Sequence, residues 1–418
     1  MSYTYVLNVC MIRGVENQKI LISGASVAGP ALAYWLRQRG FRPTVVERAP
    51  RLRGGGYAVD FRGGVHLSVL AKMGILDQVR EQQTHLDTTT YVDADSRPAA
   101  AMPAGIFAGD VEILRGDLGR ILYQATRDGT EYLFGDSITG LEQRAGGVHV
   151  TFAHAAPRVF DLVIGADGLH SAVRRLAFPD QGHARHDLGL YVSIFSVADT
   201  FGLDHAGLLY SVPGRTAAVF SARATGRAVA QFFFAAPDGT PVSYDHRDTA
   251  RQQQILAGAF DGVGWHVPAL LGQMAEAEDF YFDSVSQVRL DRWSAGRVAL
   301  IGDAGYAAGP GGNGTGTAVV AAYVLAGELA AARGDYRIAF DRYERLLRRY
   351  VARGQKQARG GRDFLAPATA EKIRQRDRFF RMLPYLPAKR LIRYLSTRTA
   401  TAITLPGYPE PAPAPGSR

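Results

Sequence analysis

Residues 18–47 read QKILISGASVAGPALAYWLRQRGFRPTVVE and change pattern four times. QKILIS and PTVVE are short apolar runs typical of buried strands, whereas PALAYWLRQRG repeats its apolar residues at helical spacing and ends on Gly40. GASVAG lies between the first strand and the helix as a tight turn. A strand, a glycine-rich turn, a helix and a second strand form the βαβ unit that binds nucleotides.

The turn has the pattern G-x-S-x-x-G, in which Ser26 stands between Gly24 and Gly29. A small serine still lets backbone amides approach a pyrophosphate, and the following helix N-terminus favours negative charge. Glu47 ends the second strand 18 residues after Gly29, where a carboxylate can accept hydrogen bonds from ribose hydroxyls. Because an acidic group repels a 2′-phosphate, the pattern favours FAD or NAD over NADP. The alternative is that this turn has a structural role only and binds no nucleotide.

A second motif, DLVIGADGLHSAVR, spans residues 161–174. An apolar strand leads into Gly165, Asp167 and Gly168, and a short helix is predicted to begin near His170 or Ser171. Taken alone, this is a common strand-to-turn pattern, so a structural role stays open.

A third motif, GRVALIGDAGYAAGPGGNGTGTAVVAAYVLAGEL, begins at Gly296. Its buried strand ends at Asp303, whose carboxylate can hold ribityl or ribose hydroxyls. A loop rich in glycine follows, and a long helix is predicted to begin between Gly314 and Thr317. Loop amides and a helix N-terminus together favour an anion at this point.

In this order and spacing, the three motifs resemble the single-component FAD-dependent monooxygenases of the aromatic-hydroxylase type. The resemblance covers residues 18–365 and is greatest to the branch that modifies polyketides and tetracyclines; EILRGDLGRIL at 112–122 also resembles the family's arginine-led helix beside the flavin. It implies an α/β fold in which a Rossmann-like FAD-binding domain is interleaved with an antiparallel-sheet substrate domain, followed by C-terminal helices.

The expected boundaries follow from this resemblance. We predict an N-terminal extension over 1–17, an FAD-binding domain over 18–65, 100–178 and 284–332, a substrate domain over 66–99 and 179–283, C-terminal helices over 333–403, and a flexible proline-rich tail over 404–418.

The resemblance also implies roles for individual residues. The FAD pyrophosphate would lie on Gly24, Ser26, Val27, Ala28 and Gly29, and its adenosine end on Glu47 and Arg48. Arg115 would contact the ribityl chain or flavin edge, and Asp167 and Gly168 would lie near both FAD and the path of the nicotinamide donor. Gly302 and Asp303 would bind the ribityl-phosphate end, and the isoalloxazine would be lined by Pro310, Gly311, Gly312, Asn313, Gly314, Thr315 and Gly316. Arg62 is a flavin or substrate contact, or else part of a surface salt bridge.

The implied reaction uses NADPH or NADH to reduce the flavin. O2 then forms a C4a-hydroperoxide, which hydroxylates an aromatic or polyketide-like ring in secondary metabolism or antibiotic modification. The chain lacks a second βαβ fingerprint, so the donor is expected to bind only transiently. A reductase or a Baeyer–Villiger-type oxygenase stays open as an alternative activity. A flavin halogenase is disfavoured because its expected W-x-W-x-I-P stretch is absent: Trp35, Trp265 and Trp293 stand isolated in the sequence.

The chain departs from the family pattern in two motifs, and the first departure gives weight to a flavin-binding scaffold without turnover. GDAGY replaces the frequent GDAAH, so Tyr306 stands at the histidine and Gly305 at the second alanine. In the glycine loop, Asn313 falls at the usual Gln and Gly316 at the usual Asn. FAD binding should survive both departures, because backbone groups make most of the site.

Residues 207–235 predict three antiparallel strands, GLLYSVPG, RTAAVFSAR and AVAQFFFA, with turns at 213–214 and 225–226. The family resemblance places such a sheet over the flavin. The aromatic residues that could stack on a polycyclic substrate are Tyr210, Phe220, Phe232 and Phe234, with Tyr57 from the loop at 54–64; core packing is the alternative for the sheet aromatics.

The amino-acid composition bears on whether the protein is disulfide-bonded, metal-binding, membrane-spanning or secreted. The chain has 418 residues, 47% of them apolar, and one cysteine, Cys10, which excludes a disulfide framework or a zinc cluster. Its histidines lack metal-ligand spacing, so no metal is expected. The apolar stretch 315–332 contains Glu328 and predicts a buried helix rather than a membrane span, and the N-terminus lacks a signal-peptide pattern, so a cytoplasmic protein is expected.

The net charge of +9 is concentrated in the C-terminal third, where residues 335–362 predict a long amphipathic helix with a basic outer face. A solvated face is one explanation, and a docking surface for an acidic partner, such as a carrier protein or an anionic membrane surface, is another. Nucleic acid is not an expected partner, because no recognition motif accompanies the charge.

Overall fold

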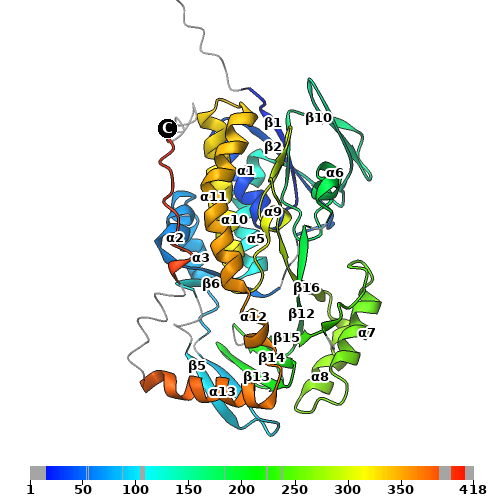
Figure 1. Ribbon diagram of the computed structural model, residues 1–418, viewed down its shortest axis with the longest axis vertical. Helices are drawn as coiled ribbons and strands as arrows, with labels where there is room; N and C mark the ends of the chain where they lie inside the picture. Colours follow the sequence, from blue (N-terminus) through cyan, green and yellow to red (C-terminus); the bar gives the residue numbers. More distant parts are fainter. Residues whose placement is uncertain are drawn as a thin grey trace, which may run out of the picture.

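The computed structural model describes residues 16–409 apart from 53, 55, 87, 104–108, 183, 223–224, 237–238 and 386–396. Most of the predicted extension, the end of the predicted tail and residues 386–396 of the predicted C-terminal helices therefore lie outside the described residues. Figure 1 shows an elongated molecule with α/β layers at one end and an antiparallel sheet at the other.

A six-stranded sheet forms the centre of the first unit. Its order is β17 (Ser294–Ala295), β18 (Val298–Leu300), β11 (Leu162–Gly165), β1 (Lys19–Ser23), β2 (Arg42–Glu47) and β7 (Glu131–Phe134). All neighbours are parallel except β17 and β18. The predicted βαβ unit is confirmed, because α1 (Ala28–Gln38) connects β1 to β2 and these strands pair in parallel. The strands of all three motifs thus lie side by side.

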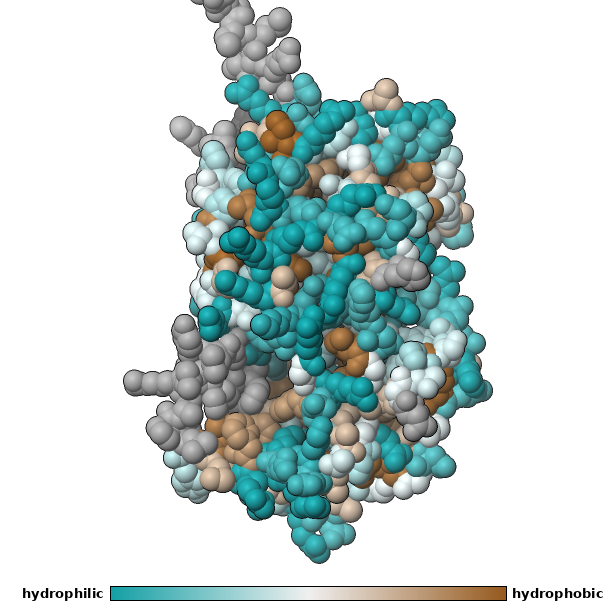
Figure 2. Space-filling view, in the orientation of Figure 1, coloured by the Kyte–Doolittle hydropathy of each residue, from teal (hydrophilic) through white to brown (hydrophobic). Residues whose placement is uncertain are grey.

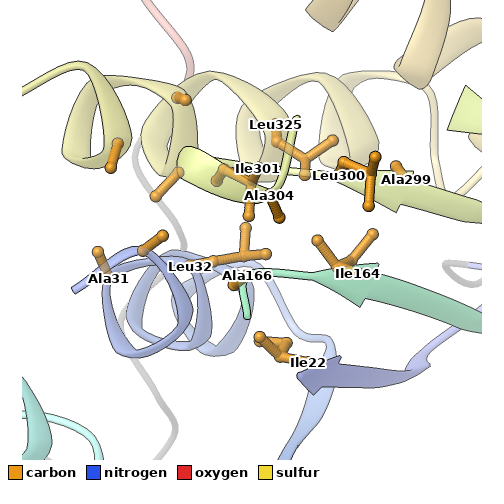
Figure 3. Close-up of a cluster of buried hydrophobic side chains, with 14 of the residues drawn as sticks. Ile22, Ala31, Leu32, Ile164, Ala166, Ala299, Leu300, Ile301, Ala304 and Leu325 are labelled. Atoms are coloured by element: carbon orange, nitrogen blue, oxygen red, sulfur yellow. The ribbon is translucent and has the colours of Figure 1, made fainter. Parts of the chain in front are cut away.

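Two helices cover this sheet, and their burial explains why their sequences are apolar. α10 (Gly314–Ala331) packs against α1, and Figure 3 shows Leu325 of α10 and Leu32 of α1 meeting strand residues such as Ile164. α10 is the one described helix long and apolar enough to cross a membrane, and 78% of it is buried inside the fold, as expected for a core helix.

Smaller elements complete the first unit: β3 (Ala58–Phe61) pairs with β6 (Val111–Leu114), and the others are α2 (Gly63–Lys72), α3 (Leu76–Glu81), α5 (Arg115–Gln124), β8 (Ile138–Arg144), β9 (Gly147–Phe152), β10 (Arg158–Phe160), α6 (Ala172–Ala177) and α9 (Asp303–Tyr306). Val69 and Leu70 of α2 and Val79 of α3 are buried in the same large core as the six-stranded sheet. Residues 66–81, predicted in the substrate domain, therefore pack on the first unit instead.

A seven-stranded sheet forms the second unit. Its order is β16 (Tyr281–Val288), β12 (Arg185–Ala198), β15 (Arg227–Ala235), β14 (Arg215–Ser221), β13 (Ala206–Val212), β4 (Thr88–Val92) and β5 (Pro98–Pro103). Neighbours are antiparallel except β13 and β4. The three strands predicted within 207–235 are confirmed, and their turns place Gly214 at φ 74° and Gly226 at φ 71°, where glycine is unstrained.

The two faces of this sheet are covered by different helices. α7 (Thr249–Ala259) and α8 (Val267–Gly272) bury one face in a second core. On the other face, α12 (Gly361–Leu365) packs beside β12 and β15, and α13 (Ala370–Met382) packs on β5 and β13. Phe380 of α13 stacks on Tyr91 of β4 with ring centroids 5.6 Å apart. The described 3-10 turns are η1 (Arg127–Gly129), η2 (Pro179–Gln181), η4 (Met274–Glu276) and η5 (Leu383–Tyr385).

The predicted long basic helix is confirmed as α11 (Tyr336–Ala358), which packs alongside α10. Most of its apolar residues are buried against the core, its arginines lie on the outer side, and Ile338 and Leu346 are exposed among them. Figure 2 shows mainly hydrophilic residues over this face of the molecule. Docking of an acidic partner on this face stays a prediction.

The C-terminal segment 397–409 returns to the first unit and packs across α10. The Tyr323 hydroxyl donates to the Pro406 carbonyl at 2.9 Å, and the Tyr408 hydroxyl donates to Glu328 Oε1 at 2.7 Å. The Arg39 guanidinium lies 5.0 to 5.7 Å from the rings of Trp35, Tyr323 and Tyr408. The segment therefore covers the buried carboxylate of Glu328.

We expect Tyr408→Phe to lower the free energy of unfolding by about 1–3 kcal/mol, because Oε1 of the buried Glu328 carboxylate loses its hydroxyl donor, while Oε2 keeps its ion pair with Arg342 at 3.9 Å. Tyr408→Ala also removes the ring and should cost about 3 kcal/mol or more. Urea denaturation measures both, with exposed Thr404→Ala as the matched control. Equal stability of Tyr408→Ala and the control would contradict a stabilising role for this segment.

Candidate functional site

The first two motifs touch through their backbones. Gly24 has φ 108°, and a side chain there would meet the Ala166 carbonyl that precedes Asp167. A side chain at Gly29 would overlap the Gly24 carbonyl. Both glycines are therefore required by close approach, and they place the β1–α1 turn directly beside the end of β11.

Glu47 joins this turn to the end of β2. Its carboxylate accepts hydrogen bonds from the backbone amides of Ala25 and Ala49, each at 2.8 Å. The third motif meets the same place, because a Cβ added at Gly302 would lie 3.2 Å from Ala28 at the start of α1. The carboxyl ends of β1, β2, β11 and β18 therefore meet at one sheet edge, the position where α/β sheets bind ligands. Arg48 follows Glu47 on the exposed side of this edge.

Arg115, at the start of α5, supplies positive charge to this edge. Its Nε and Nη2 lie 3.2 and 2.9 Å from Ser26 Oγ, to which they donate. Its guanidinium carbon lies 5.7 Å from the centroid of the Tyr57 ring. Tyr57 raises the pKa of Arg115 most, and Tyr281, Asp303 and Glu47 raise it further. Arg115 is therefore a fixed cation between the first turn and the third motif.

Asp303 begins α9 and faces the start of α10. A Cβ added at Gly314 would lie 3.7 Å from Asp303 Oδ1. Burial raises the pKa of Asp303, and the charges of Arg115 and Arg174 oppose that rise. The side chain nevertheless remains exposed to solvent, so a ligand at the sheet edge can reach the carboxylate.

The glycine loop before α10 is held by α11. Gly312 packs against Gly354, and Gln357 Nε2 donates to the Gly311 carbonyl at 2.8 Å. Asn313 adopts a left-handed conformation with φ 57° and is only 6% exposed. Its amide nitrogen has no hydrogen-bond partner among the described residues. A buried donor without a partner at the cap of a long helix is typical of a ligand site.

In the second motif, residues 161–174, the Asp167 carboxylate is used in hydrogen bonds within the protein. The Asp167 carboxylate accepts from the Ser171 hydroxyl at 2.5 Å and from the amides of Ala172 and Val173 at 2.8 and 3.2 Å. Burial raises the pKa of Asp167, and these hydrogen bonds oppose the rise. Asp167 thus fixes the start of α6, as the predicted short helix requires, and it shapes the edge rather than standing free on it.

Two residues of β16 also belong to this region, although no sequence signal singles them out. Tyr281 lies near Arg115 and Asp303, whose charges influence its pKa; burial raises that pKa most. Asp283 is 5% exposed and accepts from Tyr244 Oη at 2.7 Å, and one of its oxygens lies 2.9 Å from His170 Nε2. Sequence reasoning missed both residues because they lie outside the three motifs and reach this region only through the tertiary structure.

The Arg62 guanidinium pairs with Asp60, but its side chain is only 12% exposed, so the pair is largely buried and is not the predicted surface salt bridge. A flavin or substrate contact of Arg62 stays a prediction. The backbone amide of Arg62 donates to His66 Nδ1 at 3.1 Å. The His66 ring is fully buried, and its Nε2 lies 2.6 Å from Tyr350 Oη. Among the described residues, no cluster of three or more His, Cys, Asp or Glu side chains is placed to hold a metal ion.

The four predicted sheet aromatics divide between the two faces. Phe232 and Phe234 are 0% and 2% exposed in the second core, and the Tyr210 ring lies on the same side, 5.7 Å from that of Trp265. Phe220 is half-buried and alternates with Val219 of that core, so it lies on the opposite face.

Phe220 shares its face with Val285, which contacts the glycine loop. A Cβ added at Gly309 would lie 3.8 Å from a Val285 methyl group. The structure thus brings Phe220 alone of the four onto the face that adjoins the loop, and it places the other three in or beside the core behind the sheet.

Comparison with known proteins identifies relatives across most of the chain. The FAD binding domain family model matches residues 17–360. A flavin-dependent monooxygenase from Legionella longbeachae is 40% identical over 346 residues, covering 82% of this chain and 88% of that protein. The crystal structure of tetracycline destructase Tet(51) has a TM-score of 0.83 at 35% identity and covers 94% of this chain and 100% of that one. Klebsiella pneumoniae HpxO, crystallised with FAD and uric acid, has a TM-score of 0.70 at 22% identity, covers 94% of this chain and 99% of that one, and thus shares the fold.

The buried imidazole of His66 predicts an acid-dependent loss of stability. Burial, assisted by the charge of Arg62, lowers the pKa of His66 from 6.5 to about 4. Between these values the unfolded chain binds a proton that the folded chain excludes, so stability falls as pH drops through that window. The loss reaches about 3 kcal/mol near pH 4 and does not grow below it.

Urea denaturation of the protein and its His66→Gln variant between pH 4 and 7.5 measures this effect. The stability difference between the two should shrink as pH falls, because glutamine does not titrate. A difference that stays constant over this range would show that His66 is not excluded from protonation.

Proposed function

We propose, from the premise that this chain belongs to the FAD-binding-domain family of flavin-dependent monooxygenases, that it hydroxylates an aromatic or polycyclic small molecule with NAD(P)H and O2. The observation that carries the proposal is the row of groups at the sheet edge: the Gly24 turn, Glu47, Arg115, Asp303 and Asn313. This row contains backbone amides, carboxylates, a cation and an amide donor without a partner among the described residues, which are the kinds of group that a dinucleotide needs.

The residues present fit FAD. The bare backbone at Gly24 and the N-terminus of α1 would hold the pyrophosphate, Glu47 the adenosine ribose, and Arg115 with Asp303 the ribityl-phosphate end. Asn313 and the first turn of α10 would face the isoalloxazine. When bound, FAD would carry electrons from NADPH or NADH to O2 and deliver one oxygen atom to the substrate.

The protein's own contribution is electrostatic. The first turn of α10 presents amides that favour negative charge, and the Asn313 amide adds a donor beside them. Arg115 adds a positive charge between the β1–α1 turn and Asp303. These groups are already in place, so they need no rearrangement as charge develops on a bound cofactor.

The GDAGY departure does not remove a group from this row. The Tyr306 hydroxyl lies 2.8 Å from that of Tyr343, which donates to the Leu300 carbonyl at 3.0 Å. Burial raises the pKa of Tyr306, and its ring lies 4.5 Å from that of Trp293. Tyr306 is therefore a neutral core residue directed away from the edge, which supports turnover over a silent scaffold.

The substrate proposal rests on two features. Tet(51) is named a tetracycline destructase, and its similarity to this chain supports a polycyclic substrate in antibiotic or polyketide chemistry. Phe220 is available on the sheet face that adjoins the glycine loop, where a flat ring can stack. Because the reaction consumes NAD(P)H, a cytoplasmic location goes with this proposal.

The direct test measures FAD content and NAD(P)H oxidation with polycyclic phenols and tetracyclines. We expect bound FAD, substrate-stimulated oxidation of NADPH or NADH, and a product that gains one oxygen atom. A gain of two hydrogen atoms would favour the reductase instead. Insertion of oxygen into a ring C–C bond would favour Baeyer–Villiger chemistry. FAD that stays oxidised with every donor and substrate would favour the scaffold.

Arg115→Ala should weaken FAD binding by about 10- to 100-fold, because charge-assisted hydrogen bonds contribute about 1.5–3 kcal/mol. Arg120→Ala is the matched control, since Arg120 lies on the same helix with a side chain 55% exposed and pairs with Asp117. Quenching of FAD fluorescence on titration measures both. Equal affinities would remove Arg115 from the cofactor site.

Phe220→Ala should raise the KM for a polycyclic substrate about tenfold while leaving FAD binding and folding intact, since a stacked ring contributes about 0.5–1.5 kcal/mol beyond its buried area. Phe232→Ala should instead lower the free energy of unfolding by about 3–5 kcal/mol. Steady-state kinetics and urea denaturation separate the two. An unchanged KM in Phe220→Ala would place the substrate elsewhere.

A further inference from the structure

We propose that His66 is a positioning residue for the bound flavin: its ring, inserted under the first turn of α10, sets the place of the amides that face the isoalloxazine. The inference rests on the proposed function, because it concerns FAD at that turn. His66 comes from α2, outside the three motifs, and it contacts neither the pyrophosphate turn nor Arg115.

The ring is held on both sides. Nδ1 accepts from the Arg62 amide at 3.1 Å, so the second nitrogen, Nε2, carries the hydrogen of the neutral ring and donates to Tyr350 Oη at 2.6 Å. Tyr350 Oη in turn lies 3.4 Å from the Ala400 carbonyl, to which it donates. With both nitrogens bonded and no exposed surface, the imidazole has one tautomer and one orientation.

The ring lies against the cofactor-facing turn itself. A Cβ added at Gly316 would overlap three atoms of the His66 ring. Gly316 lies in the first turn of α10, between Asn313, whose amide nitrogen is unpartnered, and Thr317, whose hydrogen bond lowers the pKa of Tyr350 against the effect of burial. His66 and Gly316 are therefore complementary: the glycine has no side chain because the histidine fills that space.

This contact has a consequence for a bound flavin. The amides of a helix's first turn favour an anion over a neutral group, and the effect falls off within one turn. A small displacement of that turn should therefore change the binding of reduced, anionic FAD more than that of oxidised FAD. A group that only stabilised the fold would weaken both forms equally.

The experiment is a double-mutant cycle on the contact, with His66→Ala, Gly316→Ala and the double variant. Ser68→Ala on the same helix is the control, since Ser68 Oγ donates to the Val65 carbonyl within α2 at 2.8 Å. Each is studied with FAD bound. The readouts are the FAD dissociation constant, the flavin midpoint potential, the visible circular dichroism of bound FAD and the melting temperature.

We expect His66→Ala to lose about tenfold in its preference for reduced over oxidised FAD, equivalent to a shift of about −30 mV for a two-electron couple. Gly316→Ala should also change the visible circular dichroism and weaken FAD binding. In the double variant, the new methyl group occupies space left by the imidazole, so it should bind FAD more tightly than Gly316→Ala alone. Ser68→Ala should match the unmodified protein.

Tyr350→Phe provides a second test that leaves the ring in place. It removes the acceptor of the Nε2 hydrogen, so the potential should move in the same direction by a smaller amount. Strictly additive effects in the cycle, or variants that lose melting temperature while the potential and dichroism stay unchanged, would overturn the inference. Failure of the unmodified protein to bind FAD would instead overturn the proposed function.

Discussion

Close backbone approach at the carboxyl end of β1 is the constraint on which the rest of the structure depends. Gly24 lies against the Ala166 carbonyl, Gly29 against Gly24, and Gly302 against Ala28. A side chain at Gly24 or Gly29 would overlap backbone atoms, and one at Gly302 would crowd the small Ala28 side chain, so three segments separated by more than a hundred residues converge closely. The turn, the end of β11 and the start of α9 are thereby held together at one sheet edge, and the nearby side chains add charge there.

The same dependence on backbone bears on the two departures from the family pattern, at Tyr306 and Gly316. A site built from backbone amides loses little when a neighbouring side chain changes, provided the backbone stays where it is. At Tyr306 the larger ring turns into the core and bonds to Tyr343, so the edge is preserved. At Gly316 the missing side chain is matched by His66 from another helix. In both places the fold compensates by packing.

The nucleotide-binding half could be predicted from sequence because its signals are local. Strand, turn and helix lie within thirty residues, and each glycine has a conformational or steric reason that sequence spacing already suggests. The sheet aromatics were harder to place, because alternation along a strand defines two faces without saying which one meets the cofactor. That choice depends on Val285 and Gly309, which lie far from Phe220 in the chain.

Tyr281, Asp283 and His66 escaped prediction for a related reason. Each is a single polar residue in an otherwise ordinary strand or helix, and its partner comes from a distant segment. A buried polar side chain is stable only when its hydrogen bonds are made, so such residues mark places where the tertiary structure supplies specific partners. His66 and Asp283 lie beside the third and second motifs, respectively, at the sheet edge where the two units of the fold meet. Polar groups buried at that boundary therefore connect the packing of the helices to the chemistry of the site, and local sequence patterns cannot reveal that connection.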